Sequence, residues 1–350
     1  MSEAPFSLKS PLSGNPVGEP QYSIQATLRS GVKIPLADPK ATRALVALMD
    51  MQAVIGGAAS HWGGPAAFSE LMSACFGYFF YKAKQEGKEW HEQFHFVNDA
   101  GHCENGLYAL KANWQQAGLK IEDLKGFRSI ESNLSGHGEA HLFPEGVYVS
   151  NGPLGSGLPQ AQGLCAADAF SGKRRTTVVS ISDGACMEGE AREALASIPG
   201  LAKNGKMAGF VMVVSDNNTK LSGRIDEEAF SMQGTFDSLN ALGWKVLNLK
   251  QGNNLEACLQ CLDEAMEWAS EHPEQPIAIH AKTVKGFGVK KTEESSSGGH
   301  GFPLKEASEL HEFLSEIYGG DEVPAEFTKW IGELEELQSA KSSSKSSEVP

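Results

Sequence analysis

The sequence contains few cysteines, no excess of basic residues and no long apolar run. Six cysteines lie irregularly among 350 residues, which is not the spacing of a disulfide framework. Lys and Arg number 30 against 44 Asp and Glu, so the formal net charge is −14. This acidic balance argues against a protein that binds nucleic acid or a membrane surface, because both partners attract basic patches.

Membrane insertion and secretion are also not indicated. No apolar run reaches the roughly 18 residues that a membrane-spanning helix needs. The first ten residues lack a basic segment followed by an apolar core, which is the pattern of a signal peptide. Hydrophobic residues make up 41% of the chain and glycine occurs 38 times, which excludes a disordered protein. We therefore expect a cytoplasmic globular protein of the size of an enzyme.

From residue 94 onward, short apolar runs alternate with helical stretches. The runs are Phe94–Val97, Val147–Ser150, Thr177–Ile181, Phe210–Val214, Trp244–Leu249 and Ile277–Ala281. The helical stretches between them include Leu158–Ala169, Glu188–Ile198 and Leu255–Ser270. This alternation predicts an α/β fold with a mostly parallel sheet and helices on both faces.

Three segments flank this predicted α/β domain, which we place at residues 38–305. Residues 1–37 show no clear periodicity and are expected to form an extended arm. Asp38-Pro39 has the pattern of a helix start, with a capping acid before a proline. Residues 306–338 are expected to form a helical extension, and the Ser/Lys-rich residues 339–350 a disordered tail.

Two of the predicted strands are followed by oxygen-bearing side chains. Asp183-Gly184 comes after Thr177–Ile181, and Asn217-Asn218-Thr219 comes after Phe210–Val214. Ligands bind at the carboxyl ends of strands in such sheets, and carboxylate, amide and carbonyl oxygens are the ligands that Mg²⁺ prefers. Each motif alone is an ordinary turn. Their occurrence after successive strands favours a site for Mg²⁺ and a phosphate group.

Glycine- and histidine-containing loops provide further candidates. Residues 151–157 read NGPLGSG, but the dinucleotide-binding fingerprint is incomplete because Gln160 replaces its last glycine. Four histidines lie in loops of small residues: His61, His102, His137 and His300. The other six are interpreted as ordinary polar or core residues: His91, His95, His141, His272, His280 and His311. Cys258 and Cys261 form one CxxC pair inside a helical pattern and lack the further ligands that zinc needs.

These motifs together resemble the thiamine diphosphate enzymes, and specifically the N-terminal, diphosphate-binding half of transketolase. The general signature is Gly-Asp-Gly followed by Asn-Asn, which corresponds here to Ser182-Asp183-Gly184 and Asn217-Asn218, with Asn217 34 positions after Asp183. The stretches that match transketolase are SDGACMEGEAREAL at 182–195, GPLGSG at 152–157, DLKGFR…SGHGE at 123–139 and GGHGFPL at 298–304. Weaker matches, ASHWGG and NDAGHCENG, surround His61 and His102.

The resemblance implies roles for individual residues. Asp183, Asn217 and the Thr219 carbonyl correspond to the family's Mg²⁺ ligands. The cofactor would be lined by Gly152, Pro153, Leu154, Gly184, His102 and His300, with Glu188 in a supporting hydrogen-bond network. The family's polar cluster around the thiazolium and the substrate hydroxyls would be His61, His102, His137 and His300, and imidazoles suit proton transfer near neutral pH. The implied reaction moves a two-carbon ketol unit between a ketose and an aldose, most naturally sugar phosphates.

Transketolase also has a pyrimidine-binding domain and a C-terminal domain. Only 46 residues follow Leu304, whereas an ordinary domain needs about 100. We therefore expect a split transketolase in which a separate chain supplies those domains, assembled as a dimer of heterodimers. Two alternatives stay open: an α-type subunit of a 2-oxo-acid dehydrogenase or carboligase, and a non-catalytic cofactor-binding module. Ser182 and Gly138, which replace a glycine and a proline of the family, keep the second alternative open.

Overall fold

A five-stranded parallel β-sheet forms the centre of the molecule. The computed structural model describes residues 11–346. The strands are β3 (Phe94–Asn98), β4 (Thr176–Ser182), β5 (Phe210–Asp216), β6 (Lys245–Leu249) and β7 (Ile277–Lys282), in the spatial order β3-β4-β5-β7-β6. Every neighbouring pair is parallel. The predicted α/β class is confirmed.

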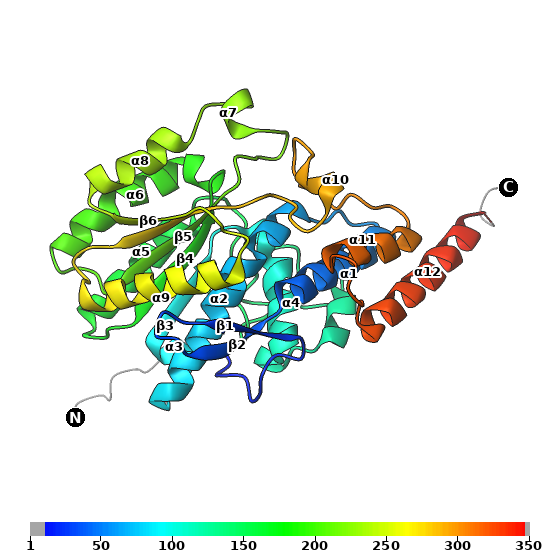
Figure 1. Cartoon of the computed structure of the whole chain (residues 1–350), viewed down its shortest axis with the longest axis horizontal. Helices are drawn as coiled ribbons and strands as arrows, with labels where there is room; N and C mark the ends of the chain where they lie inside the picture. Colours follow the sequence, from blue (N-terminus) through cyan, green and yellow to red (C-terminus); the bar gives the residue numbers. More distant parts are fainter. Residues whose placement is uncertain (1–10, 347–350) are drawn as a thin grey trace.

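Helices cover both faces of this sheet (Figure 1). Helices α2 (Gly63–Glu86) and α9 (Leu255–Glu271) pack on one face, and α5 (Gly157–Phe170), α6 (Gly189–Lys203) and α8 (Gln233–Leu242) on the other. Strand β5 shows why the strands read as continuous apolar runs. Val211 and Val213 face the first helix layer, whereas Met212 and Val214 face the second. Because alternate side chains point to opposite faces, both sets must be apolar.

A further layer of helices packs behind α2. Its main members are α1 (Pro39–Gly56), α4 (Glu104–Trp114), α11 (Leu310–Ile317) and α12 (Ala325–Ser346). The remaining short helices are α3 (Trp90–Gln93), α7 (Ile225–Glu228), α10 (Lys290–Glu293) and five 3₁₀ turns at 101–103, 116–118, 121–126, 185–187 and 307–309. Helix α1 begins as predicted, since an Asp38 carboxylate oxygen accepts a hydrogen bond from the Lys40 amide at 2.8 Å and Pro39 occupies the first position.

The structure corrects the interpretation of residues 1–37 as an extended arm. Strands β1 (Ser23–Thr27) and β2 (Lys33–Ala37) form an antiparallel hairpin that packs on α2 and α9. Leu36 is fully buried, and a Cβ at Gly77 of α2 would lie 1.9 Å from its Cδ2 atom. The hairpin can therefore pack this closely on α2 only because residue 77 is glycine. Residues 1–10 lie outside the described part of the chain.

Two other local predictions are wrong. Residues 147–150 form no strand but an irregular segment whose first residue, Val147, is buried and donates its amide hydrogen bond to the Phe143 carbonyl. Residues 339–346, predicted to be disordered, continue helix α12, where the Lys341 ammonium donates to the Ile55 carbonyl at 2.8 Å. Residues 347–350 of the predicted tail lie outside the described residues.

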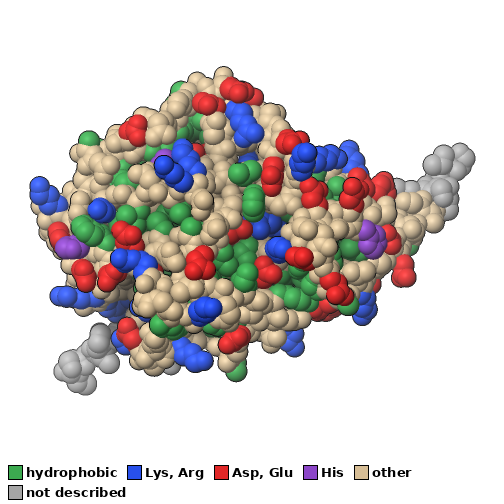
Figure 2. Space-filling model, viewed as in Figure 1, with side chains coloured by type: hydrophobic (Ala, Val, Ile, Leu, Met, Phe, Trp, Pro, Cys, Tyr) green, Lys and Arg blue, Asp and Glu red, His purple; other side chains and the backbone are tan. Residues whose placement is uncertain are grey.

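Charge on the surface is mixed. On the face drawn in Figure 2, Lys and Arg side chains are interspersed with Asp and Glu rather than gathered in one area. Among the helices of residues 11–346, none combines the length and the apolar character needed to span a bilayer.

Candidate functional site

A cavity of about 600 Å³ lies at the carboxyl ends of the central strands. Its walls come from segments far apart in the sequence, and they include most of the residues singled out by the motifs. The predicted residues that line it are His61, His102, His137, Gly152, Leu154, Asp183, Gly184, Glu188, Asn217, Thr219 and His300. Pro153 lies in the same loop as Gly152 and Leu154 but is not part of the lining.

Asp183 and Asn217 meet at the floor of this cavity, as their positions after neighbouring strands predict. One Asp183 carboxylate oxygen accepts hydrogen bonds from the amides of Asn217 at 2.9 Å and Asn218 at 2.6 Å. The Asn217 side-chain oxygen accepts from the Thr219 amide at 3.1 Å. Asp183 is 1% exposed, and burial together with nearby Asp216 raises the pKa of its carboxyl group.

The glycine loop at residues 152–157 is held by a residue that the sequence motifs missed. Asp99, directly after β3, accepts hydrogen bonds from the amides of Gly155 at 2.9 Å and Gly157 at 2.7 Å. Gly155 has a φ of 84°, and a Cβ there would lie 2.5 Å from the Cβ of Glu188. This position therefore requires glycine. The signal that could have indicated Asp99 is its place at a strand end, like that of Asp183.

The four histidines of the small-residue loops form one cluster. The ring centroid of His61 lies 5.7 Å from that of His102, 6.1 Å from that of His137 and 5.3 Å from that of His300. His102 and His300 are stacked at 5.6 Å. Residues from four separate loops, spread over about 240 positions of sequence, thus share one wall of the cavity.

Backbone pairing explains why these loops converge. The amide of Gly63 donates to the Gly299 carbonyl at 2.8 Å, which places the loop of His61 beside that of His300. A Cβ at Gly63 would lie 2.0 Å from the Gly298 carbonyl oxygen, so this approach needs glycine. On another side, the Asn151 carboxamide oxygen accepts from the Gly138 amide at 2.7 Å and joins the loop of His137 to the glycine loop.

Electrostatics keep the imidazoles neutral. Burial lowers the pKa of His61 to about 4, and the positive charge of Arg128 adds to this effect. Burial and the ammonium group of Lys285 lower the pKa of His300 to about 4. Burial also lowers the pKa of His102 and His137. At neutral pH the cluster therefore consists of uncharged rings that can donate and accept hydrogen bonds.

Lys285 is a second residue that the motifs missed. It follows β7, lines the cavity and is 4% exposed. Its ammonium group lies 3.0 Å from His300 Nδ1 and donates to the Lys220 carbonyl at 3.2 Å. No carboxylate within residues 11–346 forms an ion pair with it, and burial lowers its pKa to about 8. A buried cation without a paired anion is well suited to receive a negatively charged ligand.

The residues present fit a divalent cation and a diphosphate. A buried carboxylate, a carboxamide oxygen and a nearby backbone carbonyl form an oxygen donor set of the kind that Mg²⁺ takes. The raised pKa of Asp183 reflects a buried negative charge that a cation would stabilise. Gly152, with a φ of 140°, and Gly155 let the backbone approach a ligand closely, and Lys285 supplies a positive charge.

The remaining candidates are structural. Among the six other histidines, His95 is buried 3.1 Å from Asp168 and His280 is buried 2.6 Å from Asp216. Cys258, the first residue of the CxxC pair, is a buried free thiol of α9, which agrees with a packing role. None of the six histidines lines the cavity, within the described residues.

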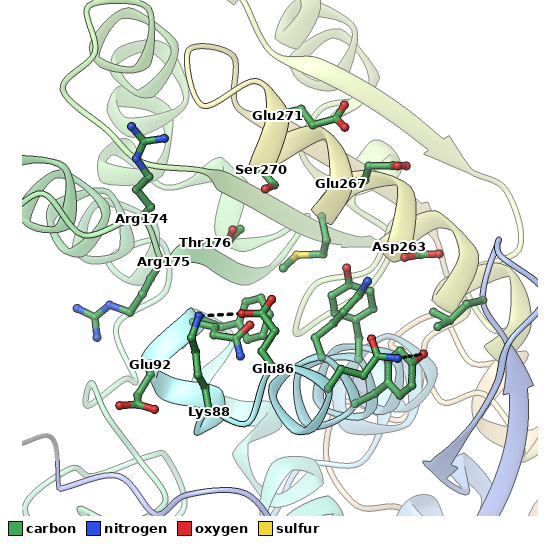
Figure 3. Close-up of a pocket in the computed structure, with 18 of the residues that line it drawn as sticks. Glu86, Lys88, Glu92, Arg174, Arg175, Thr176, Asp263, Glu267, Ser270 and Glu271 are labelled. Carbon is green, nitrogen blue, oxygen red and sulfur yellow. Dashed lines mark hydrogen bonds and ion pairs between the residues drawn. The ribbon is translucent and has the colours of Figure 1, made fainter.

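A larger cavity of about 940 Å³ opens at the other end of the sheet, where its lining includes Phe94 and Thr176, the first residues of β3 and β4 (Figure 3). Its walls carry both signs of charge: Glu86 pairs with Lys88 at 2.8 Å, and Glu267 pairs with Arg29 at 2.7 Å. None of the predicted site residues lies there. The predicted catalytic and metal-binding side chains therefore line the smaller cavity and not the larger one.

Comparison with known proteins agrees with this geometry. Residues 39–346 match the family model described as transketolase, thiamine diphosphate binding domain. The chain belongs to this family. It is 31% identical over 300 residues to a transketolase of Streptococcus pyogenes, covering 81% of this chain and 39% of that protein. It is 35% identical over 233 residues to a transketolase of Bacillus subtilis, covering 63% of this chain and 33% of that protein.

Solved transketolases share the fold. The chain superposes on the transketolase of Leishmania mexicana with a TM-score of 0.64 at 25% identity, covering 88% of this chain and 46% of that one. A transketolase from Pichia stipitis gives a TM-score of 0.65 at 24% identity, with coverage of 86% and 45%. This transketolase-family chain thus spans less than half the length of the transketolases that it matches.

Proposed function

We propose that this chain is the diphosphate-binding part of a transketolase-type enzyme that transfers a two-carbon ketol unit between a ketose and an aldose. The proposed cofactors are thiamine diphosphate and Mg²⁺. The observation that supports this most directly is the meeting of Asp183, Asn217 and four histidines around one cavity. If the turns at Asp183 and Asn217 and the histidine loops served only local structure, they would have no reason to meet at one cavity.

Asp183, Asn217 and Thr219 would hold the metal. The Asp183 carboxylate, the Asn217 carboxamide oxygen and the Thr219 carbonyl would provide three oxygen ligands, and water and diphosphate oxygens would complete the shell. Gly152, Leu154 and Gly184 line the space beside this oxygen set, with Pro153 in the same loop. The Lys285 ammonium would offset part of the diphosphate charge.

The histidines would handle the protons of the reaction. When bound, thiamine diphosphate supplies a nucleophilic carbon and an electron sink. His61, His102, His137 and His300 would bind the hydroxyl and carbonyl oxygens of the sugar and exchange protons with them. We assign Glu188 to the hydrogen-bond network that supports the cofactor. Its side chain lines the cavity and has no hydrogen-bond partner within residues 11–346.

We also propose that a separate polypeptide carries the pyrimidine-binding and C-terminal parts, in a dimer of heterodimers acting on sugar phosphates. The chain covers 39% of the Streptococcus pyogenes relative. Leu221 at the mouth of the cavity is 70% exposed and Leu154 is 40% exposed, which suits a covering partner.

Native mass spectrometry of the protein from its own cells tests the assembly. With thiamine diphosphate and Mg²⁺ present, we expect a second chain of about 300 residues in equal amount, of ordinary two-domain size. The purified complex should turn over ketose and aldose phosphates. A complex active only on 2-oxo acids would instead support a dehydrogenase-type subunit. A homodimer with no activity would support a non-catalytic module, and ketol transfer by this chain alone would contradict the split enzyme.

Isothermal titration calorimetry of the complex tests the metal site. Asp183→Asn removes the proposed charged ligand, and we expect thiamine diphosphate affinity in Mg²⁺ to fall roughly 10- to 100-fold, since a lost charged contact costs about 1.5–3 kcal/mol. The control Asp237→Asn, at an exposed position of α8, should bind like the unmodified complex. Equal affinity of the Asp183 variant would contradict the proposed ligand.

A further inference from the structure

Two cationic side chains are directed at the Nδ1 atoms of cavity histidines. The Lys285 ammonium lies 3.0 Å from His300 Nδ1, and a terminal guanidinium nitrogen of Arg128 lies 3.5 Å from His61 Nδ1. A guanidinium and an ammonium group only donate hydrogen bonds and cannot accept them. In both contacts the histidine Nδ1 must therefore be the acceptor, with its lone pair toward the cation.

The charge states of these groups are compatible with this arrangement at neutral pH. Burial lowers the pKa of Lys285 to about 8 while Asp183 opposes the effect, so the ammonium form predominates at pH 7. The pKa values of His300 and His61 are lowered to about 4, so both rings are neutral. The charged or titratable groups that act on His300 are Lys285 and His61, and those that act on His61 are Arg128, His137 and Lys285. His102 also packs against both rings.

Arg128 is held in place for such a role. Its φ of 60° is in the left-handed region, which is uncommon for a residue other than glycine. Its guanidinium donates to the Ala59 carbonyl at 2.5 Å and to the Gly136 carbonyl at 3.5 Å. A Cβ at Gly136 would lie 2.4 Å from that guanidinium. The side chain thus bridges the loops that carry His61 and His137.

We propose that Lys285 and Arg128 are positioning residues that hold His300 and His61 as neutral tautomers with the proton on Nε2. In a neutral imidazole, acceptance at one nitrogen leaves the proton on the other. No group within residues 11–346 forms a hydrogen bond with either Nε2, and both rings line the cavity. The cavity therefore offers two N–H donors to carbonyl, hydroxyl or phosphate oxygens.

This inference deepens the proposed function, because it assigns the two rings to hydrogen-bond donation rather than to proton abstraction in their resting state. A donor that is already oriented stabilises negative charge developing on an oxygen. The two tautomers are those of the chain before any ligand binds, so they can be measured without cofactor or partner.

Side-chain ¹⁵N NMR of the full chain labelled at histidine tests it at pH 7. The signals are assigned from the spectra of His61→Gln and His300→Gln. We expect the Nε2 atoms of both residues to show the shift of a protonated nitrogen and the Nδ1 atoms that of an unprotonated one. The opposite pattern, or an equal mixture of tautomers in the unmodified chain, would overturn the proposal.

Variants of Lys285 and Arg128 distinguish an effect on the histidine tautomers from a general effect on folding. Lys285→Met should change His300 alone from one tautomer to a mixture, and Arg128→Met should do so for His61. Lys285→Arg keeps a donor and should retain the His300 tautomer, and Lys203→Met, at an exposed position of α6, should alter neither. An unchanged His300 tautomer in a folded Lys285→Met chain would contradict the role of Lys285. If the unmodified complex does not bind thiamine diphosphate, the proposed function is contradicted but the tautomers of His61 and His300 are not.

Discussion

Asp99 holds the glycine loop that borders the candidate site. It is fully buried beneath the glycine loop and accepts hydrogen bonds from Gly155 and Gly157. Burial raises its pKa to about 6, the hydrogen bonds from these glycine amides oppose that rise, and Glu188 adds to it. The carboxyl group that accepts the loop's hydrogen bonds is therefore a titratable group with a raised pKa.

The raised pKa predicts a pH dependence of stability. Between about pH 4 and pH 6 the folded state keeps a proton on Asp99 that the unfolded state has lost. The contribution of Asp99 to the free energy of unfolding should therefore fall as pH rises through this window, by about 2–3 kcal/mol, because one pKa unit corresponds to about 1.4 kcal/mol. Histidines with a lowered pKa, such as His61 and His300, contribute in the opposite direction, so the Asp99 contribution is measured as a difference between variants. Urea denaturation from pH 4 to 6.5 measures it.

Asp99→Asn should remove this contribution, so between pH 4 and pH 6.5 its free energy of unfolding should rise by about 2–3 kcal/mol relative to that of the unmodified chain. Asp237→Asn is the control, since this exposed carboxyl group should leave the slope unchanged. Identical slopes for the Asp99 variant and the unmodified chain would mean that Asp99 titrates normally.

At the scale of elements, the glycine loop and helix α5 behave differently although they are contiguous. Gly155 in the loop has a positive φ and faces Glu188 closely, whereas a Cβ added at Gly163 in the helix would meet no atom within 4 Å. The same substitution at these two glycines should therefore have opposite effects.

Gly155→Ala should lower the free energy of unfolding by about 1–3 kcal/mol, because alanine is strained at this φ and would collide with Glu188. Gly163→Ala should raise it by about 0.5–1 kcal/mol, since alanine is the better helix former. Thermal unfolding of both variants measures the difference. A Gly155 variant as stable as the Gly163 variant would contradict the observed loop conformation.

At the scale of the whole molecule, an exposed apolar side chain lies toward each end of the sheet, but only one of them lines the candidate site. Leu221 is 70% exposed beside the histidine cluster, and Phe170 is 78% exposed at the end of α5, beside the loop leading into β4. If a partner covers the candidate site, only the first should become buried in the complex.

Leu221→Asp should weaken association with the proposed partner roughly 10- to 100-fold, because burial of a leucine contributes about 1.5–3 kcal/mol. The stability of the isolated chain should change by less than about 0.5 kcal/mol, since the side chain is exposed. Phe170→Asp is the matched control and should leave association unchanged. Co-purification at several salt concentrations measures both, and equal association of the two variants would place the partner elsewhere.

Much of the fold could be predicted from local patterns. Five of the six apolar runs are strands, because strands covered by helices on both faces are mostly apolar along their length. Val147–Ser150 has the same composition but forms no strand. Its buried valine packs in the helical layer with Phe143, and a short apolar run does not reveal whether its partner is a strand or a helix. The roles assigned to the site residues stay predictions.

The sequence by itself determined the parallel sheet, the start of α1 and the motifs around Asp183, Asn217 and the four histidines. These depend on periodicity, capping and spacing, which are local properties. Only the tertiary structure decided that β1 and β2 form a hairpin, that Asp99 holds the glycine loop, and that Lys285 and Arg128 face His300 and His61. Such contacts join residues distant in sequence, and they depend on how closely packed elements approach, which no local pattern encodes.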